Sequence, residues 1–412
     1  MSKNLLIFTA CLVGLLSAVG MSLPYPILAP LFADGSVSNL NHFLGLSPKF
    51  LLGLALAINP LGILMGSSIL GPLSDRHGRR TILLATIVFS AIGHLAVVAA
   101  LVMENYPMFL LARFVTGLAE GNTSLINALL ADEIDGEQRV RAFALFNGAN
   151  YGGWLLGPLI AGATVQFGIT VPFSSAAIVL LLTFGLGWMV FPKHAPQLVV
   201  TRDDGTSNYN GEANTFGLLR HRAMRQLFIL NLARTVGVTA FYEYFPLLLV
   251  EQAKLGAGGI SIVSGVLCAV MMGTSALVGH GWLRTGGTSR LGLFNYALAA
   301  LILLSTVSNP VIAIGAMVLF GVPNALYTAV FPAYCSERYS SYGNGTVLSL
   351  LSNIFCISNV IVALIGSGLT VVDTRLILVL GAATTLWAGW RITPWIAANA
   401  EGPGLVAEEA QV

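Results

Sequence analysis

The sequence predicts an all-α polytopic membrane protein with twelve transmembrane helices in two six-helix halves. Of its 412 residues, 56% are hydrophobic and only 9% are charged, whereas soluble domains carry about 25% charged residues. The mean hydropathy is +0.81. Apolar stretches of about 20 residues, long enough to cross a bilayer as helices, recur from end to end. The predicted spans are 5–32, 50–72, 81–103, 107–132, 142–167, 171–192, 224–251, 258–281, 291–308, 310–335, 344–370 and 374–397.

The first span is predicted to be a retained, kinked helix. It is longer than the apolar core of a signal peptide, and it contains Pro24, Pro26 and Pro30. Membrane helices tolerate such prolines at kinks. A signal anchor without further function is the alternative interpretation.

One long polar stretch, residues 193–222, divides the chain between the sixth and seventh spans. It is rich in Asp, Gly, Ser and Asn, a composition typical of loops. We therefore predict an N-terminal half (1–192), a cytoplasmic linker (193–222), a C-terminal half (223–397) and a cytoplasmic tail (398–412).

The distribution of basic residues predicts that both termini face the cytoplasm. With that orientation, fifteen of the 20 lysines and arginines lie inside, and only Lys49, Lys254 and Arg375 lie outside. This asymmetry follows the positive-inside rule. The net charge of +2 therefore reflects membrane topology, and we expect no nucleic-acid partner.

The cysteines and histidines do not predict a metal site, a disulfide or a cofactor. The six histidines show no HExxH spacing, and His94 lies inside a predicted span. Packing is the favoured interpretation of His94, and a proton relay is the alternative. The four cysteines lie in apolar spans without CxxC spacing and are interpreted as small core residues: Cys11, Cys268, Cys335 and Cys356.

Weak similarity between the halves suggests a parallel repeat of six helices. Residues 117–133 align without gaps to 321–337, and the glycines of 71–78 match those of 279–286 in position. The charges are not shared between the halves. Arg113 aligns with Met317, Glu120 with Asn324, and Asp132 with Ser336.

The stretch GPLSDRHGRR between the second and third spans concentrates charge in an apolar chain. Gly71-Pro72 is predicted to end one helix, and Gly78 to allow a tight turn. Asp75 can accept hydrogen bonds from a helix N-terminus or from an arginine. We predict a gating segment formed by Gly71, Asp75, Arg76, Gly78, Arg79 and Arg80, together with Asp132 at the end of the fourth span.

These residues resemble the loop signature of the major facilitator superfamily, G-x-L-x-D-R-x-G-R-[RK]. RFVTG (113–117) and Gly148 with GPLIAG (157–162) resemble two signatures of its drug/proton antiporters, and 131–145 resembles tetracycline-type efflux proteins. The resemblance implies a cytoplasmic latch, in which Asp75 faces the start of helix 11 near 342–346 and Arg79 approaches Asp132. A simple positive-inside anchor is the alternative.

Arg113 and Glu120 are predicted to take part in proton coupling. They are seven residues apart within one span, which places them on one helix face about 10 Å apart along the axis. Ionisable groups at this depth indicate function. A static polar pair, or a neutral Glu120 at a packing interface, remains the alternative.

The fifth span contains NGANYGGWLLGP, which combines polar, aromatic and small residues. Its predicted cavity-lining face comprises Asn147, Asn150, Tyr151 and Trp154. Gly148 and Gly152 have the GxxxG spacing that lets helices approach closely, and Gly157-Pro158 predicts a kink. The predicted hinge residues are Gly148, Gly152, Gly157, Pro158 and Gly162.

In the seventh span, Glu243 lies among aromatic residues just before Pro246. This pattern predicts a proton-coupling carboxylate in a cavity beside a broken helix. Arg234 lies on the opposite face of a straight helix and is predicted to face a neighbouring helix; it is included among the proton-coupling candidates. Further predicted cavity residues are Tyr25, Asn59, Tyr242, Tyr244, Asn324, Tyr327, Asn353 and Asn359.

The sequence favours a secondary active transporter that exports a small amphipathic molecule against protons by alternating access. Tetracycline itself and strongly cationic substrates are disfavoured, because the first span lacks an acidic residue and Asn59 is neutral. An importer of a sugar, organic acid or siderophore is the alternative. No HExxH or GxSxG motif supports an enzyme. We expect a monomer in the bacterial inner membrane, with protons as the coupling ion and no cofactor.

Overall fold

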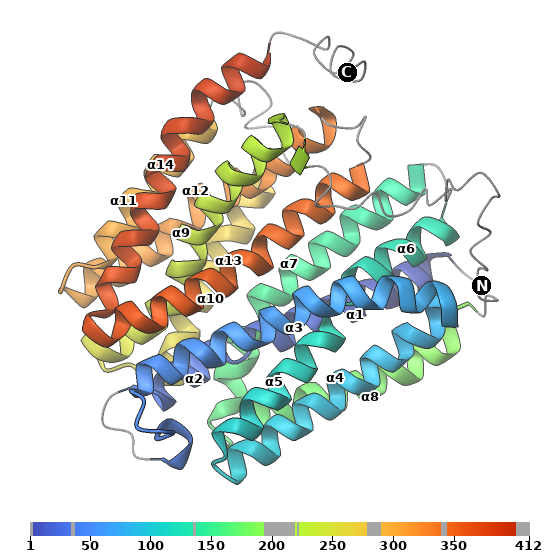
Figure 1. The fold of residues 1–412 in the computed structure, drawn as a ribbon, viewed down its shortest axis with the longest axis horizontal. Coiled ribbons are helices and arrows are strands. Elements are labelled where there is room, and N and C mark those ends of the chain that lie inside the picture. Colours follow the sequence, from blue (N-terminus) through green and yellow to red (C-terminus); the bar gives the residue numbers. More distant parts are fainter. Residues whose placement is uncertain are drawn as a thin grey trace. The chain divides into compact units, whose positions relative to one another are not determined.

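The computed structural model describes residues 3–33, 38–134, 137–192, 219–220, 222–277, 290–338 and 344–400. The elements within these ranges are helical (Figure 1). They are α1 (Lys3–Ser22), α2 (Tyr25–Leu31), the 3-10 turn η1 (Asn39–Asn41), α3 (Pro48–His77), α4 (Arg79–Val102), α5 (Tyr106–Glu120), α6 (Thr123–Glu133), α7 (Glu137–Val165), α8 (Val171–Val190), α9 (Arg222–Ala253), α10 (Ala257–Leu277), α11 (Leu291–Ser305), α12 (Pro310–Arg338), α13 (Asn344–Val372) and α14 (Thr374–Ala400).

The fourteen α-helices of these described ranges correspond to the twelve predicted spans, because two spans are each built from two helices. The first is broken at Leu23-Pro24 into α1 and α2, and the fourth at Gly121-Asn122 into α5 and α6. Within the described part of the chain, eight spans are long and apolar enough to cross a membrane by length and composition, and α11 is apolar but shorter. The remaining spans are α5–α6, α7 and α9.

Two of the predicted helix interruptions at proline do not occur. Helix α3 continues past Gly71-Pro72 and ends at His77, and α9 runs through Pro246. Helix α7 is continuous through Pro158, and the kink predicted there stays a prediction. Packed membrane helices can re-satisfy the backbone groups that a proline leaves free. The predicted turn at Gly78 is present, with φ of +87°, in the left-handed region that favours glycine.

The chain forms two compact units, which we describe separately. The first contains residues 1–211, 242–266 and 356–377, and the second contains 212–241, 267–355 and 378–412. Helices α9, α10, α13 and α14 each contribute to both units. Most of the predicted linker and the matching loop 279–286 lie outside the described residues, so the predicted half boundaries stay a prediction.

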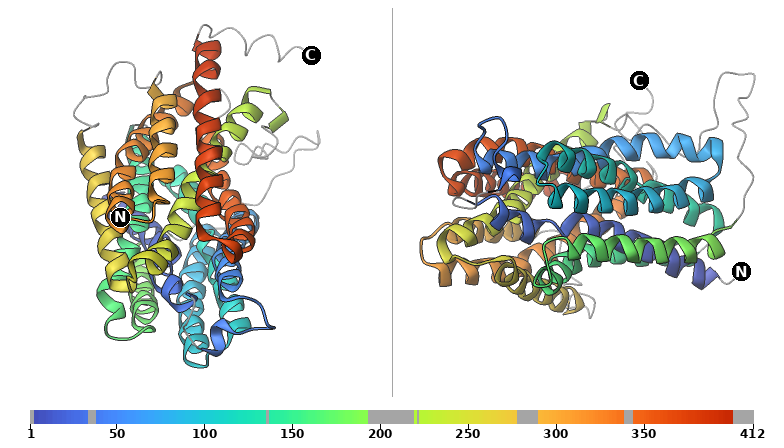
Figure 2. Two further views of the ribbon diagram at one scale, coloured as in Figure 1. Left: turned by 90° about the vertical axis from the view of Figure 1, so that its left-hand side faces the viewer. Right: turned by 90° about the horizontal axis from the view of Figure 1, so that it is seen from below.

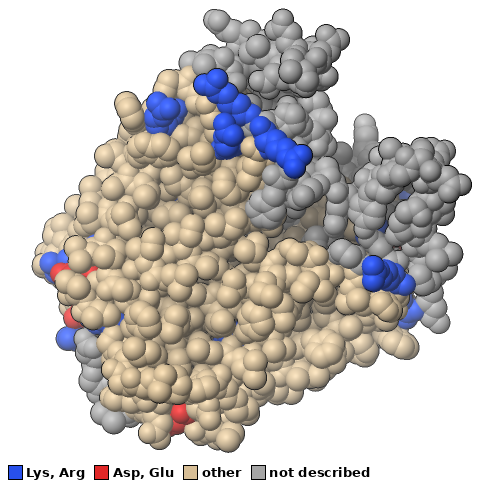
Figure 3. All heavy atoms as spheres, in the orientation of Figure 1, with Lys and Arg blue, Asp and Glu red and all other residues tan. Residues whose placement is uncertain are grey.

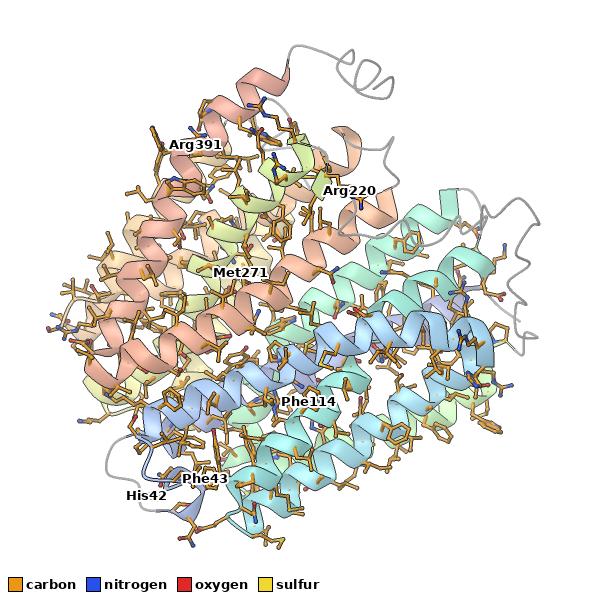
Figure 4. All side chains as sticks on the ribbon, viewed as in Figure 1. His42, Phe43, Phe114, Arg220, Met271 and Arg391 are labelled. Carbon is orange, nitrogen blue, oxygen red and sulfur yellow. The ribbon has the colours of Figure 1, made fainter. Side chains whose placement is uncertain are left out.

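Within the first unit, glycines set how closely α3 and α5 approach. Gly62 and Gly66 of α3 face Gly117 of α5 and Gly121, which directly follows α5; each pair has GxxxG spacing. A Cβ atom at Gly62 would lie 2.5 Å from the backbone oxygen of Phe114, the α5 residue labelled in Figure 4. The backbones therefore touch, as in other small-residue helix contacts.

Helix α1 packs along α7 in the same unit, and Figure 2 gives two further views of these helices. The contact does not use the predicted pair Gly148 and Gly152, because a Cβ atom at either would meet no described atom within 4 Å. Gly153 and Gly157, on a neighbouring face, pack directly on α1. The segment contains two consecutive GxxxG spacings, 148–152 and 153–157, and packing decides which one contacts α1.

In the second unit, an apolar cluster links α9, α11, α12 and α14. Its members include Met224, Leu227, Leu291, Phe331 and Ile392. Helix α10 joins through Gly321 of α12, where a Cβ atom would lie 3.0 Å from Cγ of Met271, labelled in Figure 4.

The described surface suits a lipid environment. Large apolar side chains are highly exposed, such as Leu182 at 70% and Val311 at 76%. On the face drawn in Figure 3, the described charged residues are few, and a broad area between them is uncharged. Two exposed tryptophans, Trp188 near the end of α8 and Trp390 within α14, lie against the guanidinium groups of Arg80 and Arg391, a combination typical of membrane interfaces.

Candidate functional site

Glu120 lies in a closed polar cluster within the first unit. It is 1% exposed, and it shares its surroundings with His94 (0%) and Asn59 (1%). The Asn59 Nδ2 group donates to Glu120 Oε2 at 3.0 Å and to the Arg113 carbonyl at 3.2 Å. The second carboxylate oxygen, Oε1, lies 3.5 Å from His94 Nε2. The cluster therefore joins α3, α4 and α5.

Local sequence explains how these side chains meet. Glu120 is the last residue of α5, immediately before the break at Gly121. Gly117 brings α3 so close that a Cβ atom there would lie 3.1 Å from Asn59 Nδ2. Gly20 of α1 faces the carboxylate, and its Cβ atom would lie 2.8 Å from His94 Nε2 and overlap Glu120 Oε1. A side chain at position 20 would displace the cluster.

Arg113 is 3% exposed, and its guanidinium group contacts α1 instead of forming an ion pair with Glu120. Its Nη1 group donates to the Gly20 carbonyl at 3.4 Å. Glu120 and Tyr25 both lie within electrostatic range of its charge. Arg113 and Glu120 thus share one environment, as expected from their spacing, and they bracket the same residue of α1.

A second cluster in the first unit contains several of the predicted cavity residues. The rings of Tyr25 (α2) and Trp154 (α7) lie 5.9 Å apart, and the Tyr25 hydroxyl donates to Asn359 Oδ1 on α13 at 3.4 Å. Tyr244 donates to the Ala363 carbonyl at 3.1 Å. Glu243 is 2% exposed and within electrostatic range of Tyr25. Neither of its oxygens has a hydrogen-bond partner among the described residues.

The remaining predicted cavity residues have different surroundings. Asn59 contacts Glu120, as described above. Asn150 and Asn353 are half-buried, as is Tyr242. The side chains of Asn147 and Tyr151 lie outside the described residues.

A third cluster lies in the second unit around Arg234. Its Nη2 group donates to Asn324 Oδ1 at 2.6 Å, and its guanidinium carbon lies 3.8 Å from the centre of the Tyr327 ring. Arg234 is 5% exposed and faces α12, the neighbouring helix that its predicted orientation required. Asn324 and Tyr327 are therefore partners of a fixed cation.

The predicted gating segment is described only in part. Gly78 forms the turn, and Arg76 is exposed. Arg80 donates to the Trp188 carbonyl, which ties the start of α4 to the end of α8. Arg79 is half-buried, but the side chains of Asp75 and Asp132 and residues 339–343 lie outside the described part. The predicted latch therefore stays a prediction.

Two of the predicted hinge glycines pack against neighbouring helices. Gly162 packs on Ser261 of α10, and Gly157 packs on Ser22 of α1. Within the described ranges, His, Cys, Asp and Glu do not gather in groups of three that could hold a metal ion.

Two central residues of the Glu120 cluster have surroundings that the sequence does not predict. The sequence favours packing for His94 and a substrate cavity for Asn59, yet both contact Glu120. Each is a lone polar residue in an apolar span, which is the signal that singles them out. The spacing of residues within one helix does not predict which faces of different helices pack together.

Comparison with known proteins identifies the family. Residues 10–363 match the family model described as Major Facilitator Superfamily. The chain belongs to the Major Facilitator Superfamily. A solved D-xylose-proton symporter is similar with a TM-score of 0.73 and 16% identity, over 95% of this chain and 97% of that one. The POT-family transporter PepTSo gives 0.75, with 12% identity, over 97% and 99%. The predicted twelve-span fold is confirmed.

Curated members of the superfamily include resistance proteins similar to this chain. The class C tetracycline resistance protein of Escherichia coli is 31% identical over 177 residues, 42% of this chain and 41% of that protein. Multidrug resistance protein MdtG of Dickeya zeae is 28% identical over 229 residues, 55% of this chain and 53% of that protein. The matched segment thus spans about half or less of each relative. The predicted resemblance to tetracycline-type proteins is confirmed, and so is the prediction that the chain is not an enzyme.

Proposed function

We propose that this superfamily member is a secondary active transporter that exports a small amphipathic molecule in exchange for protons. The observation that carries the proposal is the burial of two carboxylates, Glu120 and Glu243, in helices of the fourth and seventh predicted spans. Buried carboxylates at that depth are costly unless they serve ion or substrate movement. The similarity to tetracycline and multidrug resistance proteins supports the export direction.

The two carboxylates differ in their surroundings, which suggests different tasks. Glu120 lies among polar groups on neighbouring helices, so its charge can be balanced without substrate. Glu243 lies within electrostatic range of Tyr25, whose ring contacts Trp154, and both Glu243 oxygens are unpartnered among the described residues. Aromatic rings and a carboxylate suit a planar amphipathic substrate with a hydrogen-bond donor. We assign proton exchange to Glu120 and substrate contact to the Glu243 cluster.

The proposal includes a location in the bacterial inner membrane with both termini in the cytoplasm. The positive-inside distribution of Lys and Arg supports this orientation. The halves 1–192 and 223–397 would then alternate access to the substrate site, as parallel six-helix repeats do in this kind of transporter. A monomer suffices for this cycle, because each chain carries both halves.

Proton movement coupled to substrate provides the direct test. Purified protein in liposomes with a pH-sensitive dye inside should move protons when a neutral amphipathic dye is added, and should respond less to ethidium or tetracycline. Glu243→Gln should weaken the response to every substrate by about tenfold, a loss of about 1.4 kcal/mol of binding. Substrate uptake into intact cells that falls without the protein would instead indicate import. Absence of proton movement with the whole panel would contradict the proposal.

An ion pair joins two helices at one end of the first unit, and we expect this contact to break during transport. Lys49 Nζ at the start of α3 lies 2.7 Å from Glu251 Oε1 near the end of α9, and Thr374 Oγ1 donates to the same oxygen at 2.9 Å. In the proposed orientation, which follows from the basic residues at the opposite helix ends, Lys49 and Arg375 lie on the outer side of the membrane.

Joining positions 49 and 251 should stop transport. In a variant lacking the four native cysteines, Lys49→Cys with Glu251→Cys, treated with a bifunctional thiol reagent, should lose nearly all dye export and recover it after reductive cleavage of the reagent. Either single cysteine variant, treated identically, is the matched control and should keep its activity. Full export by the crosslinked protein would show that this contact does not open during the cycle.

A further inference from the structure

His94 is a titratable residue that the proposed function has not used. It lies in the middle of α4, fully buried, with its Nε2 atom 3.5 Å from Glu120 Oε1. That separation suits an ion pair but is longer than a well-formed hydrogen bond. Neither ring nitrogen, nor Glu120 Oε1, has a hydrogen-bond partner among the described residues. Two unsatisfied titratable atoms therefore face each other in a closed space.

The groups around this pair come from five helices. Arg113 supplies one positive charge from α5, and Tyr25 of α2 lies within range of that charge. Helix α3 contributes the neutral amide of Asn59, and α1 contributes the backbone of Gly20. Helix α8 contributes the Phe173 ring, whose centre lies 6.3 Å from that of His94. Among the described residues, the charged and titratable groups facing the pair are thus Arg113 and, at longer range, Tyr25.

Charge balance indicates how many protons the His94–Glu120 pair can hold. Buried charges are tolerated when they are paired. With His94 neutral, the positive charge of Arg113 is matched by ionised Glu120. One additional proton can be held by either Nε2 or Oε1, and these two atoms face each other while Asn59 holds the other oxygen. The geometry leaves no other described partner for that proton.

The position equivalent to Glu120 in the second half cannot bind a transported proton. Asn324 aligns with Glu120 and has no titratable proton. It accepts a hydrogen bond from Arg234, whose guanidinium is always charged. The corresponding place in the second unit is therefore occupied by a fixed cation, which would repel a proton.

We propose that His94 and Glu120 form one proton-binding site, in which a single transported proton is shared between Nε2 and Oε1. On loading, an N–H or O–H bond forms with a proton from water at one membrane face. On release, that bond breaks and the proton passes to water at the other face. This inference rests on the proposed proton coupling and adds His94 as the second proton-carrying residue.

Titration of each residue in the absence of substrate tests the site, with the proton itself as the only probe. Infrared spectra of the reconstituted full chain, recorded across pH 4 to 10, report the C=O band of protonated Glu120, which Glu120→Gln removes. His94→Gln should shift the pH midpoint of this band by about one pH unit or more, because coupled groups titrate together. Reciprocally, Glu120→Gln should shift the titration of the ¹⁵N-labelled His94 ring measured by NMR.

Exposed residues provide the matched controls. His42→Gln and Glu104→Gln remove a histidine and a carboxylate that are exposed, and neither should alter the titration of the pair. If His94→Gln does not fold, the ring titration in Glu120→Gln measures the same coupling from the other side. Independent titration of the two residues, or a Glu120 band that does not change with pH, would overturn the shared site. Coupled titration without proton-driven export would support the site and contradict the exporter.

Discussion

Glu120→Gln is expected to reduce proton-driven export by at least about 100-fold, a change of about 2.8 kcal/mol in the coupled step. The amide keeps the size of the side chain and can still contact Asn59 Nδ2 through its oxygen, but it cannot release a proton. Exchange of substrate across the membrane without a pH gradient does not require that proton and should continue. Initial rates with and without an imposed gradient, measured on the same liposomes, distinguish these two effects.

The control for this experiment is Glu104→Gln, which changes an exposed carboxylate that accepts a hydrogen bond from the Asn39 backbone. It should keep both activities. A size-exclusion profile like that of the unmodified protein shows that Glu120→Gln is folded. Gradient-driven export at the original rate in a folded Glu120→Gln protein would remove Glu120 from the proton pathway and leave Glu243 as the remaining buried carboxylate.

Gly66→Leu is expected to destabilise the protein by at least about 2 kcal/mol, within the range known for overpacked cores. A Cβ atom at this position would overlap the Leu118 carbonyl oxygen and lie 2.9 Å from the Leu118 Cα atom. Backbone atoms cannot move aside as a flexible side chain can, so α3 and α5 would have to separate. Separation would also move Asn59 away from Glu120, because the same two helices hold both residues.

Thermal unfolding followed by fluorescence and size exclusion measures this effect. Gly185→Leu is the matched control, since it introduces the same side chain into α8 at a place where a Cβ atom meets nothing within 4 Å. It should leave the unfolding temperature nearly unchanged. Equal unfolding temperatures for the two variants would mean that the α3–α5 glycine contact does not limit stability.

The helix ends show which local signals decide structure in an apolar chain. Gly78 acts as expected, because a positive φ is a property of one residue and its neighbours. The prolines at 72, 158 and 246 do not interrupt their helices, whereas Leu23-Pro24 does. The sequence pattern does not predict the break at Gly121-Asn122. Whether a helix breaks depends on whether neighbouring helices satisfy the freed backbone groups, and that information lies outside the local sequence.

The charged residues of the candidate site also show which features the sequence predicts and which depend on tertiary packing. Glu120 and Arg113 can be recognised from sequence, because ionisable residues in an apolar span are rare and costly. Arg234 is expected to face a neighbouring helix, and it contacts Asn324 and Tyr327 on α12. The identity of those partners cannot be predicted, since they lie about ninety residues further along the chain.

By itself, the sequence determined the membrane class, the twelve spans and the residues whose burial carries an electrostatic cost, because these follow from composition and from the length of apolar segments. Only the tertiary structure decided which GxxxG pair α7 uses and which polar residues surround Glu120. Asn59 and Glu120 are separated by 61 residues, and their contact depends on how glycine-bearing faces of α3 and α5 pack. Such packing is set by the fit of many side chains at once, so no single spacing in the chain specifies it.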